Sequence, residues 1–409
     1  MQLVERHVIR KNNSFFEECD KLCFASKNLY NRANYLVRQS FIHNNNYLSY
    51  NTIQKQLQNE LCYKALPAKV SQQTLKLLEN NWKSFCHANK SYEEAPSRFL
   101  GKPKLPKYKD LTKGRFAVVY TNQAISKTAL KKRGVVNPSQ TKIEIKTTLF
   151  YEAICQVRIV PKPSQYIIEI VYEENINDLK LNLDNVASVD LGVDNLAAVT
   201  SNKLGFQPIL VNGRPLKAIN QFYNKRKAEL QSCLPKGKGT TSRIQRLSTK
   251  RNFKVDDYMH KASRCIINKL IVNDIGTLVI GKNDGWKQES IMGKQSNQKF
   301  TCLPHDKFIR QLKYKGELVG IKVIVTEESY SSKASFLDLD SIPVYQKGKN
   351  YHFSGRRIKR GMYKSSNGRK LNADVNGSFN IMRKVSPSMF LTEGLEGVVV
   401  RPMKVTLPN

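Results

Sequence analysis

The sequence predicts a protein of the α/β + β class, in which a β unit with a helical insertion precedes a separate α/β unit. Three patterns predict this arrangement. Apolar residues recur every three or four positions within residues 14–95, as in amphipathic helices. Alternating β-branched residues follow within 141–173, and from about residue 183 apolar strands alternate with helical segments. A chain of 409 residues, 40% of them hydrophobic, is long enough for two or three such units.

The N-terminal half begins with a short expected strand in residues 1–13. A first helix is then predicted by the spacing of Phe15, Cys19, Leu22, Ser26, Leu29, Ala33 and Leu36, and a second helix is expected near 70–88. Alternation predicts antiparallel strands at 141–148, 152–160 and 164–173. We therefore expect residues 1–13 and 96–182 to form one β domain, with 14–95 inserted as a helical unit.

Residues 183–385 form the expected α/β domain. The stretch "NVASVDLGVDNLAAVTS" predicts two strands joined by a tight turn at Gly192. A long helical stretch over 214–273 is broken by "LPKGKGTTS" (234–242), which lacks the spacing of a phosphate-binding loop and is interpreted as a helical hairpin turn. The remaining expected elements are strands at 276–281 and 321–327, helices at 304–319 and 372–385, and a basic loop at 328–370, while the tail 386–409 receives no assignment.

The charge of the chain points to a polyanionic partner. The formal net charge is +35, from 68 Lys and Arg against 33 Asp and Glu, and such an excess repels itself unless phosphates neutralise it. Nucleic acid is the first candidate and an anionic membrane surface the second. No apolar run long enough to span a bilayer is seen, and the N-terminus lacks a signal peptide's apolar core. We expect a cytoplasmic, nucleoid-associated protein.

Residues 101–134 carry ten Lys and Arg against one acid, with aromatic residues interleaved. This composition favours contact with a nucleic-acid backbone. The candidate contacts are Lys104, Lys107, Lys109 and Arg115.

The cysteines do not predict a metal site. Eight are present and none forms a C-x-x-C pair, which suits a reducing compartment. Cys19 and Cys23 are four residues apart and so share one face of a helix, where we expect them to be apolar core residues. The six histidines show no zinc-finger spacing.

Two aspartates stand where metal ligands would. Asp190 ends an apolar strand just before Gly192, and Asp374 begins a helix after a basic loop. Hydrolysis of a phosphodiester by two Mg²⁺ ions needs three or four carboxylates from separate segments. Each aspartate also has a structural interpretation, since Asp190 can accept backbone bonds in a turn and Asp374 can cap its helix. Their order within a very basic chain favours a nuclease.

At these residues the sequence resembles a known family. "SVDLGVDNLAAV", "GWKQ", "SYSSKASF" and "NADVNGSFNI" resemble the RuvC-like nuclease segments of TnpB, the OrfB protein of certain insertion sequences, which is related to type V CRISPR effectors. "NLYNRANYLVRQ" (28–39), "PKLPKYKD" (103–110) and "RNFKVDDYMHKASRCI" (251–266) are similar to the same family. Together the matching segments extend over nearly the whole chain.

The resemblance implies a β-barrel-like wedge domain with a helical recognition insertion, followed by an RNase H-like RuvC domain. It implies RNA-guided cleavage of double-stranded DNA beside a short transposon-associated motif, with a noncoding guide RNA from the transposon end. It also implies that Asp190 and Asp374 are the first and third RuvC acids and bind Mg²⁺. The helical unit is then expected to face the DNA motif or the heteroduplex.

The sequence departs from this family at two places. The usual glutamate at the end of the second RuvC strand is replaced by Gly281, and the four-cysteine zinc knuckle is missing, because residues 331–371 contain no cysteine and Ala334 stands at the first expected position. We therefore predict no zinc and expect packing and phosphates to hold that loop. Its basic residues are expected to contact nucleic acid, with Arg356, Arg357, Lys359 and Arg360 as candidates.

A replacement for the missing acid is predicted on the neighbouring strand. The strand at 321–327 ends in Glu327 and Glu328, and adjacent strands lie only about 4.8 Å apart, within reach of a Glu side chain. Successive residues face opposite ways, so one of the two is expected to bind metal, and the sequence does not say which. Asp284 and Glu289 are weaker candidates, and Asp194 is a further possible ligand that is expected in a turn. Trp286 either stacks on a base or has a core or hinge role.

Three functions remain open from the sequence. The first is an active RNA-guided, Mg²⁺-dependent DNA endonuclease with a relocated glutamate. The second is a nuclease-dead, RNA-guided DNA-binding repressor, in which Gly281 marks a lost site. The third is a transposase that acts on DNA without a guide.

Overall fold

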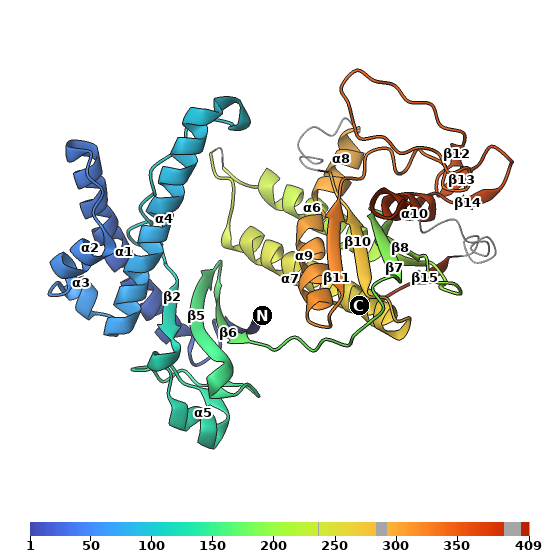
Figure 1. The fold of residues 1–409 in the computed structure, drawn as a ribbon. Coiled ribbons are helices and arrows are strands. Elements are labelled where there is room, and N and C mark those ends of the chain that lie inside the picture. Colours follow the sequence, from blue (N-terminus) through green and yellow to red (C-terminus); the bar gives the residue numbers. More distant parts are fainter. Residues whose placement is uncertain (236, 284–292, 388–401, 409) are drawn as a thin grey trace. The chain divides into compact units, whose positions relative to one another are not determined.

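The computed structural model describes residues 1–235, 237–283, 293–387 and 402–408. The chain divides into two compact units, Met1–Glu174 and Asn175–Asn409, and each has a hydrophobic core of its own (Figure 1). The division falls a few residues before the border at 183 expected from the sequence. Among the described residues, no helix is both long and apolar enough to cross a membrane.

The first unit is built on an antiparallel sheet with the strand order β1-β6-β5-β2. Its strands are β1 (Gln2–Arg10), β2 (Val118–Thr121), β5 (Ile154–Lys162) and β6 (Gln165–Glu173). β1 and β2 remain at the two edges of this sheet, so within the described residues it is an open sheet and not a closed barrel. A short two-stranded ladder, β3 (Val135–Val136) with β4 (Ile145–Lys146), is all that forms of the strand expected at 141–148.

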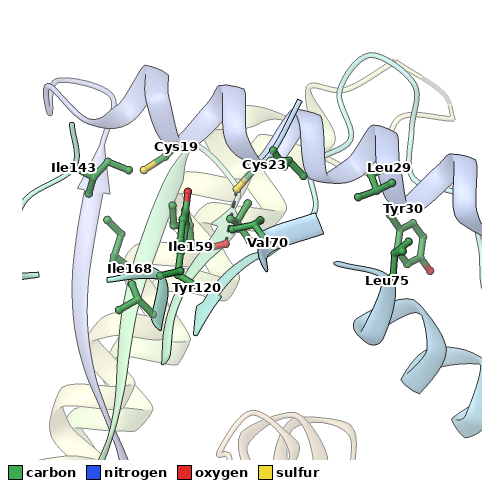
Figure 2. Packing of buried hydrophobic residues seen from close by; sticks show 14 of the residues in the cluster. Cys19, Cys23, Leu29, Tyr30, Val70, Leu75, Tyr120, Ile143, Ile159 and Ile168 are labelled. Atoms are coloured by element: carbon green, nitrogen blue, oxygen red, sulfur yellow. Dashed lines mark hydrogen bonds between the residues drawn. The ribbon is translucent and has the colours of Figure 1, made fainter. Parts of the chain in front are cut away.

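The first unit contains two long helices, α1 and α4, and three short ones. They are α1 (Phe16–Asn44), α2 (Tyr50–Leu57), α3 (Leu61–Lys64), α4 (Ala68–Glu94) and α5 (Lys127–Arg133). Cys19 and Cys23 of α1 point into the core shared with the sheet, beside Ile159 and Ile168 (Figure 2). Both are fully buried and free, and burial raises the pKa of the Cys19 thiol to about 12, so the prediction that they are apolar core residues is confirmed.

The second unit contains a six-stranded mixed sheet with the order β11-β10-β7-β8-β9-β15. Its strands are β7 (Val186–Leu191), β8 (Asn195–Ser201), β9 (Ile209–Asn212), β10 (Thr277–Gly281), β11 (Lys322–Thr326) and β15 (Met403–Val405). Its helices are α6 (Arg214–Ser232), α7 (Ser242–Val272), α8 (Lys294–Thr301), α9 (His305–Glu317) and α10 (Ala373–Val385). The helical hairpin, the two later strands and the last helix thus form close to where the sequence predicts them.

The two faces of this sheet carry different helices (Figure 1). Val189 and Leu191 of β7 pack with α7 and α9 in one core, whereas Val186 of β7 and Leu210 of β9 pack with α10 in another. This follows from the alternation of side chains along a strand. Asp190, which lies between Val189 and Leu191, therefore faces α10.

The segment expected as a basic loop at 328–370 contains a small antiparallel sheet instead. Its strands are β12 (Arg356–Lys359), β13 (Met362–Lys364) and β14 (Lys370–Asn372). Tyr363 of this sheet is buried, and its hydroxyl donates to the carbonyl of Lys333. The few apolar residues of this small sheet are separated by lysines and arginines, so the alternation expected of strands is not visible in the sequence. β9 and β15 were not predicted either, since both are too short to show a clear alternation.

Candidate active site

Asp190 lies near the end of β7, in the middle of the second unit's sheet. β10 runs parallel to β7 with Ile280 paired to Val189, so the next residue pair along these strands is Gly281 with Asp190. β11 continues the parallel arrangement, with Thr326 paired to Gly281. The carboxyl ends of three parallel strands thus meet at one edge, where ligands typically bind in sheets of this kind.

A buried network of hydroxyl groups fixes α10 against β7. The Ser188 hydroxyl donates to the Ser378 carbonyl over 2.6 Å, and the Ser378 hydroxyl donates to the Ser188 carbonyl over 3.0 Å. The Thr200 hydroxyl of β8 lies 2.9 Å from that of Ser378. Ser188 precedes Asp190 by two residues, and Ser378 follows Asp374 by one helical turn. The network therefore sets the position of one aspartate relative to the other.

Helix α10 also approaches the Asp190 carboxylate closely at Gly377. A Cβ atom at position 377 would lie only 2.7 Å from the Asp190 Oδ2 atom, which is closer than real contacts of this kind. Glycine at 377 therefore lets the helix pass over this carboxylate.

Asp374 lies in the first turn of α10, where the helix dipole favours negative charge. The capping role considered from the sequence belongs to Asn372, whose side chain accepts from the amides of Asp374 and Val375. The Asp374 Oδ2 atom accepts from the Asn195 side chain over 2.7 Å, and Oδ1 lies 3.6 Å from the Arg357 guanidinium. The side chain of Asp374 is thus left for interactions within the site.

Glu328 occupies the space beside Gly281. A Cβ atom built on Gly281 would lie 2.7 Å from the Glu328 Oε2 atom and 2.5 Å from the Ile381 Cδ1 atom of α10. The Glu328 amide donates to the Asn283 side chain over 3.0 Å, which holds the turn after β11 against the end of β10. The Oε2 atom is buried and has no hydrogen-bond partner among the described residues. A carboxylate from the turn after the next strand therefore fills the position where the family's glutamate would be expected.

Glu327 is engaged elsewhere. Its Oε2 atom forms an ion pair of 2.5 Å with Lys384, whose side chain is only 8% exposed, and its Oε1 atom accepts from the Ser329 amide. Of the two glutamates proposed from the sequence, the structure brings Glu328 toward Asp190 and Asp374 and pairs Glu327 with a lysine. Asp284, Glu289 and Trp286 lie outside the described residues.

Burial raises the pKa of two of these acids, Asp190 and Glu328. Desolvation raises the pKa of Asp190 well above its usual value, and the negative charges of Glu328 and Asp374 raise it further, while Arg357 opposes them. Burial raises the pKa of Glu328 to about 7, with a smaller contribution from Glu327. Three neighbouring carboxylates with one unpartnered oxygen form an unfavourable arrangement that a bound cation would relieve.

These acids do not form a preorganised metal-binding site. Within the described part of the chain, no three metal-ligating side chains converge closely enough to hold a cation as they stand. The chemistry of the donors nevertheless fits a hard divalent cation, since all three are carboxylates and one buried oxygen lacks a partner.

The segment that follows Glu328 is held by α10 without cysteines. Asn376 and Asn380, one turn apart, both donate to the carbonyl of Ala334, and Asn376 accepts from the Phe336 amide. Ala334 itself is fully buried. The position expected to hold a zinc ligand is thus packed against a helix.

Two further aspartates tie the rest of this segment together. Asp338 accepts from the amide and the hydroxyl of Ser366 at 2.9 and 2.5 Å. Asp340 accepts from the amide of Ser335 and from both the amide and hydroxyl of Ser354. The expectation that packing and phosphates hold this loop therefore missed its principal internal contacts, because a hydrogen-bonding Asp–Ser pair leaves no distinctive spacing in a sequence.

The candidate basic residues of this region separate into two groups. Arg357 and Arg360 line a cavity of about 850 Å³ together with Asp194 and Asp374. Asp194, in the turn after β7 as expected, forms ion pairs with Arg360 and Lys217. Arg356 and Lys359 are exposed on β12.

The candidate basic residues of the first unit also differ from one another. Lys104, Lys107 and Lys109 line a shallow groove of about 400 Å³ between their own segment and α4. Asn31 of α1 clamps this segment, since its side chain bonds both the amide and the carbonyl of Lys109.

Arg115 has a different environment from these lysines. Its guanidinium makes a bidentate pair with Asp20 and also donates to the carbonyls of Thr112 and Gly114. Four of its five N–H donors are thereby used within the fold. This is a correction to the expected phosphate contact, because the geometry favours a structural role for Arg115.

Sequence reasoning missed the residues that position the acids. Asn195, Gly377, Ser378 and the pair Asn376 and Asn380 all act through contacts between distant segments. The only signal in the sequence was the i, i+4 spacing of polar residues within "NADVNGSFNI", where Asp374 and Ser378 share one face and Asn376 and Asn380 another.

Comparison with known proteins gives two family-model matches. Residues 169–287 match OrfB_IS605, described as a probable transposase, and residues 305–381 match the Cas12f1-like TNB domain. No curated protein matches the chain.

Several solved structures show a distant likeness. A Cas12f1–sgRNA–target DNA complex is 14% identical with a TM-score of 0.37, covering 93% of this chain and 98% of that chain. CasPhi-2 (Cas12j) bound to crRNA is 9% identical with a TM-score of 0.41, covering 94% and 98%. The mini-RNA-guided endonuclease CRISPR-Cas_phi3 is 9% identical with a TM-score of 0.42, covering 94% and 92%.

Proposed function

The chain belongs to the TnpB-like family of RuvC effectors, and from this premise we propose that it is an RNA-guided, metal-dependent DNA endonuclease. The observation that carries the proposal is that Asp190, Asp374 and Glu328 lie near one another at one edge of the sheet. Burial and the charges of Glu328 and Asp374 raise the pKa of Asp190, and the Glu328 Oε2 atom has no partner among the described residues. Such an arrangement is costly for stability and is typical of a functional site.

The three carboxylates would hold divalent cations, which we expect to be Mg²⁺. When bound, a pair of such ions stabilises the attacking and leaving oxygens of a phosphodiester. Asp190 is held at the centre by the strand register and by Gly377, and Asp374 is oriented by Asn195. Glu328, two residues after the end of β11, would supply the carboxylate that Gly281 cannot.

The basic surfaces would bind the nucleic acids. Guide RNA and target DNA appear in the description of the similar Cas12f1 structure, and we propose a noncoding RNA from the transposon end and double-stranded DNA as the partners of this chain. Lys104, Lys107 and Lys109 would contact a backbone at the groove beside α4. Arg356, Arg357, Lys359 and Arg360 would contact phosphates near the acids, with guide pairing reading the target sequence.

The proposal is tested with the purified chain and RNA transcribed from its flanking transposon end. A plasmid library matching the guide, with randomised flanks, is incubated with Mg²⁺ and sequenced for cleavage. We expect cleavage that needs the guide, the cation and a particular flank, and that is lost in Asp190→Ala. Asp184→Ala, at an exposed position before β7, is the matched control. Flank-dependent binding without cutting in the wild type would favour the guided repressor, and guide-independent cutting would favour the transposase.

A further inference from the structure

Glu328 is the first residue of a tight turn with a strained backbone. The Ser331 amide donates to the Glu328 carbonyl over 3.1 Å, which closes a four-residue turn over 328–331. Tyr330, the third residue of this turn, has a φ of 62°. Glycine or asparagine is the usual residue at such a position, because a Cβ atom is crowded in the left-handed conformation. A tyrosine therefore keeps this conformation only where its surroundings compensate for the strain.

The Tyr330 ring packs on two aromatic rings from a later part of the same segment. Its centroid lies 5.1 Å from that of Tyr351, in an edge-to-face arrangement, and 5.9 Å from that of Phe353. These distances are typical of aromatic pairs, each of which changes an equilibrium constant about 2–10-fold. The two contacts supply the stabilisation that the left-handed backbone of Tyr330 requires.

Asp340 fixes the chain next to one of these rings. It accepts hydrogen bonds from the amide and the hydroxyl of Ser354, the residue that follows Phe353. Contacts therefore lead without a break from Asp340 through Phe353 to the ring of Tyr330. The aspartate that ties this segment together without cysteines thus also supports the turn of Glu328.

The turn is fastened at both ends. The Glu328 amide donates to the Asn283 side chain over 3.0 Å, and the Ser331 carbonyl accepts from the Asn380 side chain of α10 over 2.9 Å. Tyr330 lies between these two anchors. Its backbone conformation therefore sets the direction in which Glu328 leaves the turn.

We propose that Tyr330 is a positioning residue for Glu328, whose ring contacts keep the turn in the conformation that directs this carboxylate into the space beside Gly281. The inference rests on the proposed function, because Glu328 is an acid that this function assigns to the metal site. An acid at the end of a strand is positioned by the register of the sheet. An acid in a turn after the strand needs a contact of another kind, and the Tyr330 ring provides it.

Hydrogen–deuterium exchange of the full-length chain, without nucleic acid, tests whether the ring holds the turn. Tyr330→Asn removes the ring and keeps a residue that tolerates positive φ, whereas Tyr330→Phe keeps the ring. Loss of two aromatic contacts should speed exchange of the Ser331 amide by about tenfold, after correction for its intrinsic rate. Tyr330→Phe should exchange like the wild type.

Leu339→Asn is the matched control. Leu339 lies in the same segment with a φ of 51°, and it is 52% exposed. The next amide, that of Asp340, donates to the Ser335 carbonyl over 3.1 Å and so corresponds to the Ser331 amide after Tyr330. We expect exchange at Asp340 to change little in Leu339→Asn, because an exposed side chain contributes little packing. Unchanged exchange at Ser331 in Tyr330→Asn would overturn the proposal.

Stabilisation by Mn²⁺ separates a positioning role from a merely structural one. Melting temperatures are measured against MnCl₂ concentration without nucleic acid, since a cation that binds the folded chain raises the melting temperature by mass action. We expect Tyr330→Asn to need several-fold more Mn²⁺ than the wild type for the same rise, and Tyr330→Phe and Leu339→Asn to need the same amount. Faster exchange at Ser331 with an unchanged Mn²⁺ requirement would overturn the proposal, because the ring would then only stabilise the fold.

This inference and the proposed function fail in different ways. If the wild type responds to Mn²⁺ and cuts guided DNA, but Tyr330→Asn matches it in exchange and in Mn²⁺ requirement, the positioning role is rejected and the nuclease stands. If the wild type neither responds to Mn²⁺ nor cuts, the nuclease is rejected, and the positioning role is rejected with it.

Discussion

The Glu328 carboxylate lies where a side chain on Gly281 would have to be, with its Oε2 atom 2.7 Å from the position of a Cβ on residue 281. The glycine that replaces an acid at the end of β10 and the glutamate that follows β11 are therefore linked, because both positions share one space. Only one of the two positions can carry a side chain at a time, because Ile381 of α10 closes the other side of this space at 2.5 Å.

Restoring an acid at position 281 should therefore harm the wild-type protein. We expect Gly281→Glu to lower stability by about 1–3 kcal/mol through overpacking against Glu328 and Ile381. Combining it with Glu328→Gly should recover part of that loss, and thermal unfolding of the two variants measures the difference. If the double variant is no more stable than Gly281→Glu alone, the two side chains do not compete for one space.

Glu328 and Glu327 should differ in their effect on cleavage. We expect Glu328→Gln to reduce the cleavage rate by more than the roughly 10–100-fold typical of residues that only support a metal site. Glu327→Gln should keep the rate within a few-fold, because that side chain is bound to Lys384. Single-turnover cleavage of a matched DNA measures both. The opposite order of effects would show that Glu327 is the ligand.

The segment after β11 should fold without zinc. Its contacts are carboxylate–serine bonds of Asp338 and Asp340, together with two asparagines of α10. We expect substoichiometric zinc in the purified protein by elemental analysis, and no change in melting temperature with a zinc-selective chelator.

Asp340 should contribute directly to the stability of this segment. Asp340→Asn is expected to cost about 1–3 kcal/mol, since it weakens hydrogen bonds to a charged acceptor. Asp184→Asn is the matched control at an exposed position. Equal melting temperatures for the two variants would mean that the Asp340 contacts do not hold the segment.

Lys315 should give the second unit a pH-dependent stability. Burial lowers the pKa of this lysine from its usual value of 10.5 to about 8, although it donates to the His260 carbonyl and the Ser263 hydroxyl. Between pH 8 and 10.5 the unfolded chain holds more protons than the folded chain at this site, so its contribution to stability rises with pH.

Replacing Lys315 by methionine removes that dependence. The melting temperature of Lys315→Met should exceed that of the wild type by the largest margin at about pH 7. This margin should shrink as the pH rises through 8 to 10.5. A difference in melting temperature that stays constant over this range would show that the folded-state pKa is not lowered.

Much of the fold could be predicted from local patterns. The helix at Phe16–Asn44, the hairpin of β7 and β8 and the helix at Ala373–Val385 all carry strong periodicity or a capping residue next to their boundaries. The strands β9, β15 and β12 to β14 could not be predicted, because three or four residues are too few to show alternation.

By itself the sequence determined that Asp190 ends a buried strand, that Asp374 starts a helix, and that two acids follow the strand after Gly281. Those facts are encoded within a few residues of each position. Only the tertiary structure decided that Glu328 and not Glu327 faces the aspartates, and that Arg115 is used within the fold. Each of these depends on strand order and register between segments far apart in the chain, and the local period of side chains carries no information about which strand will lie beside another.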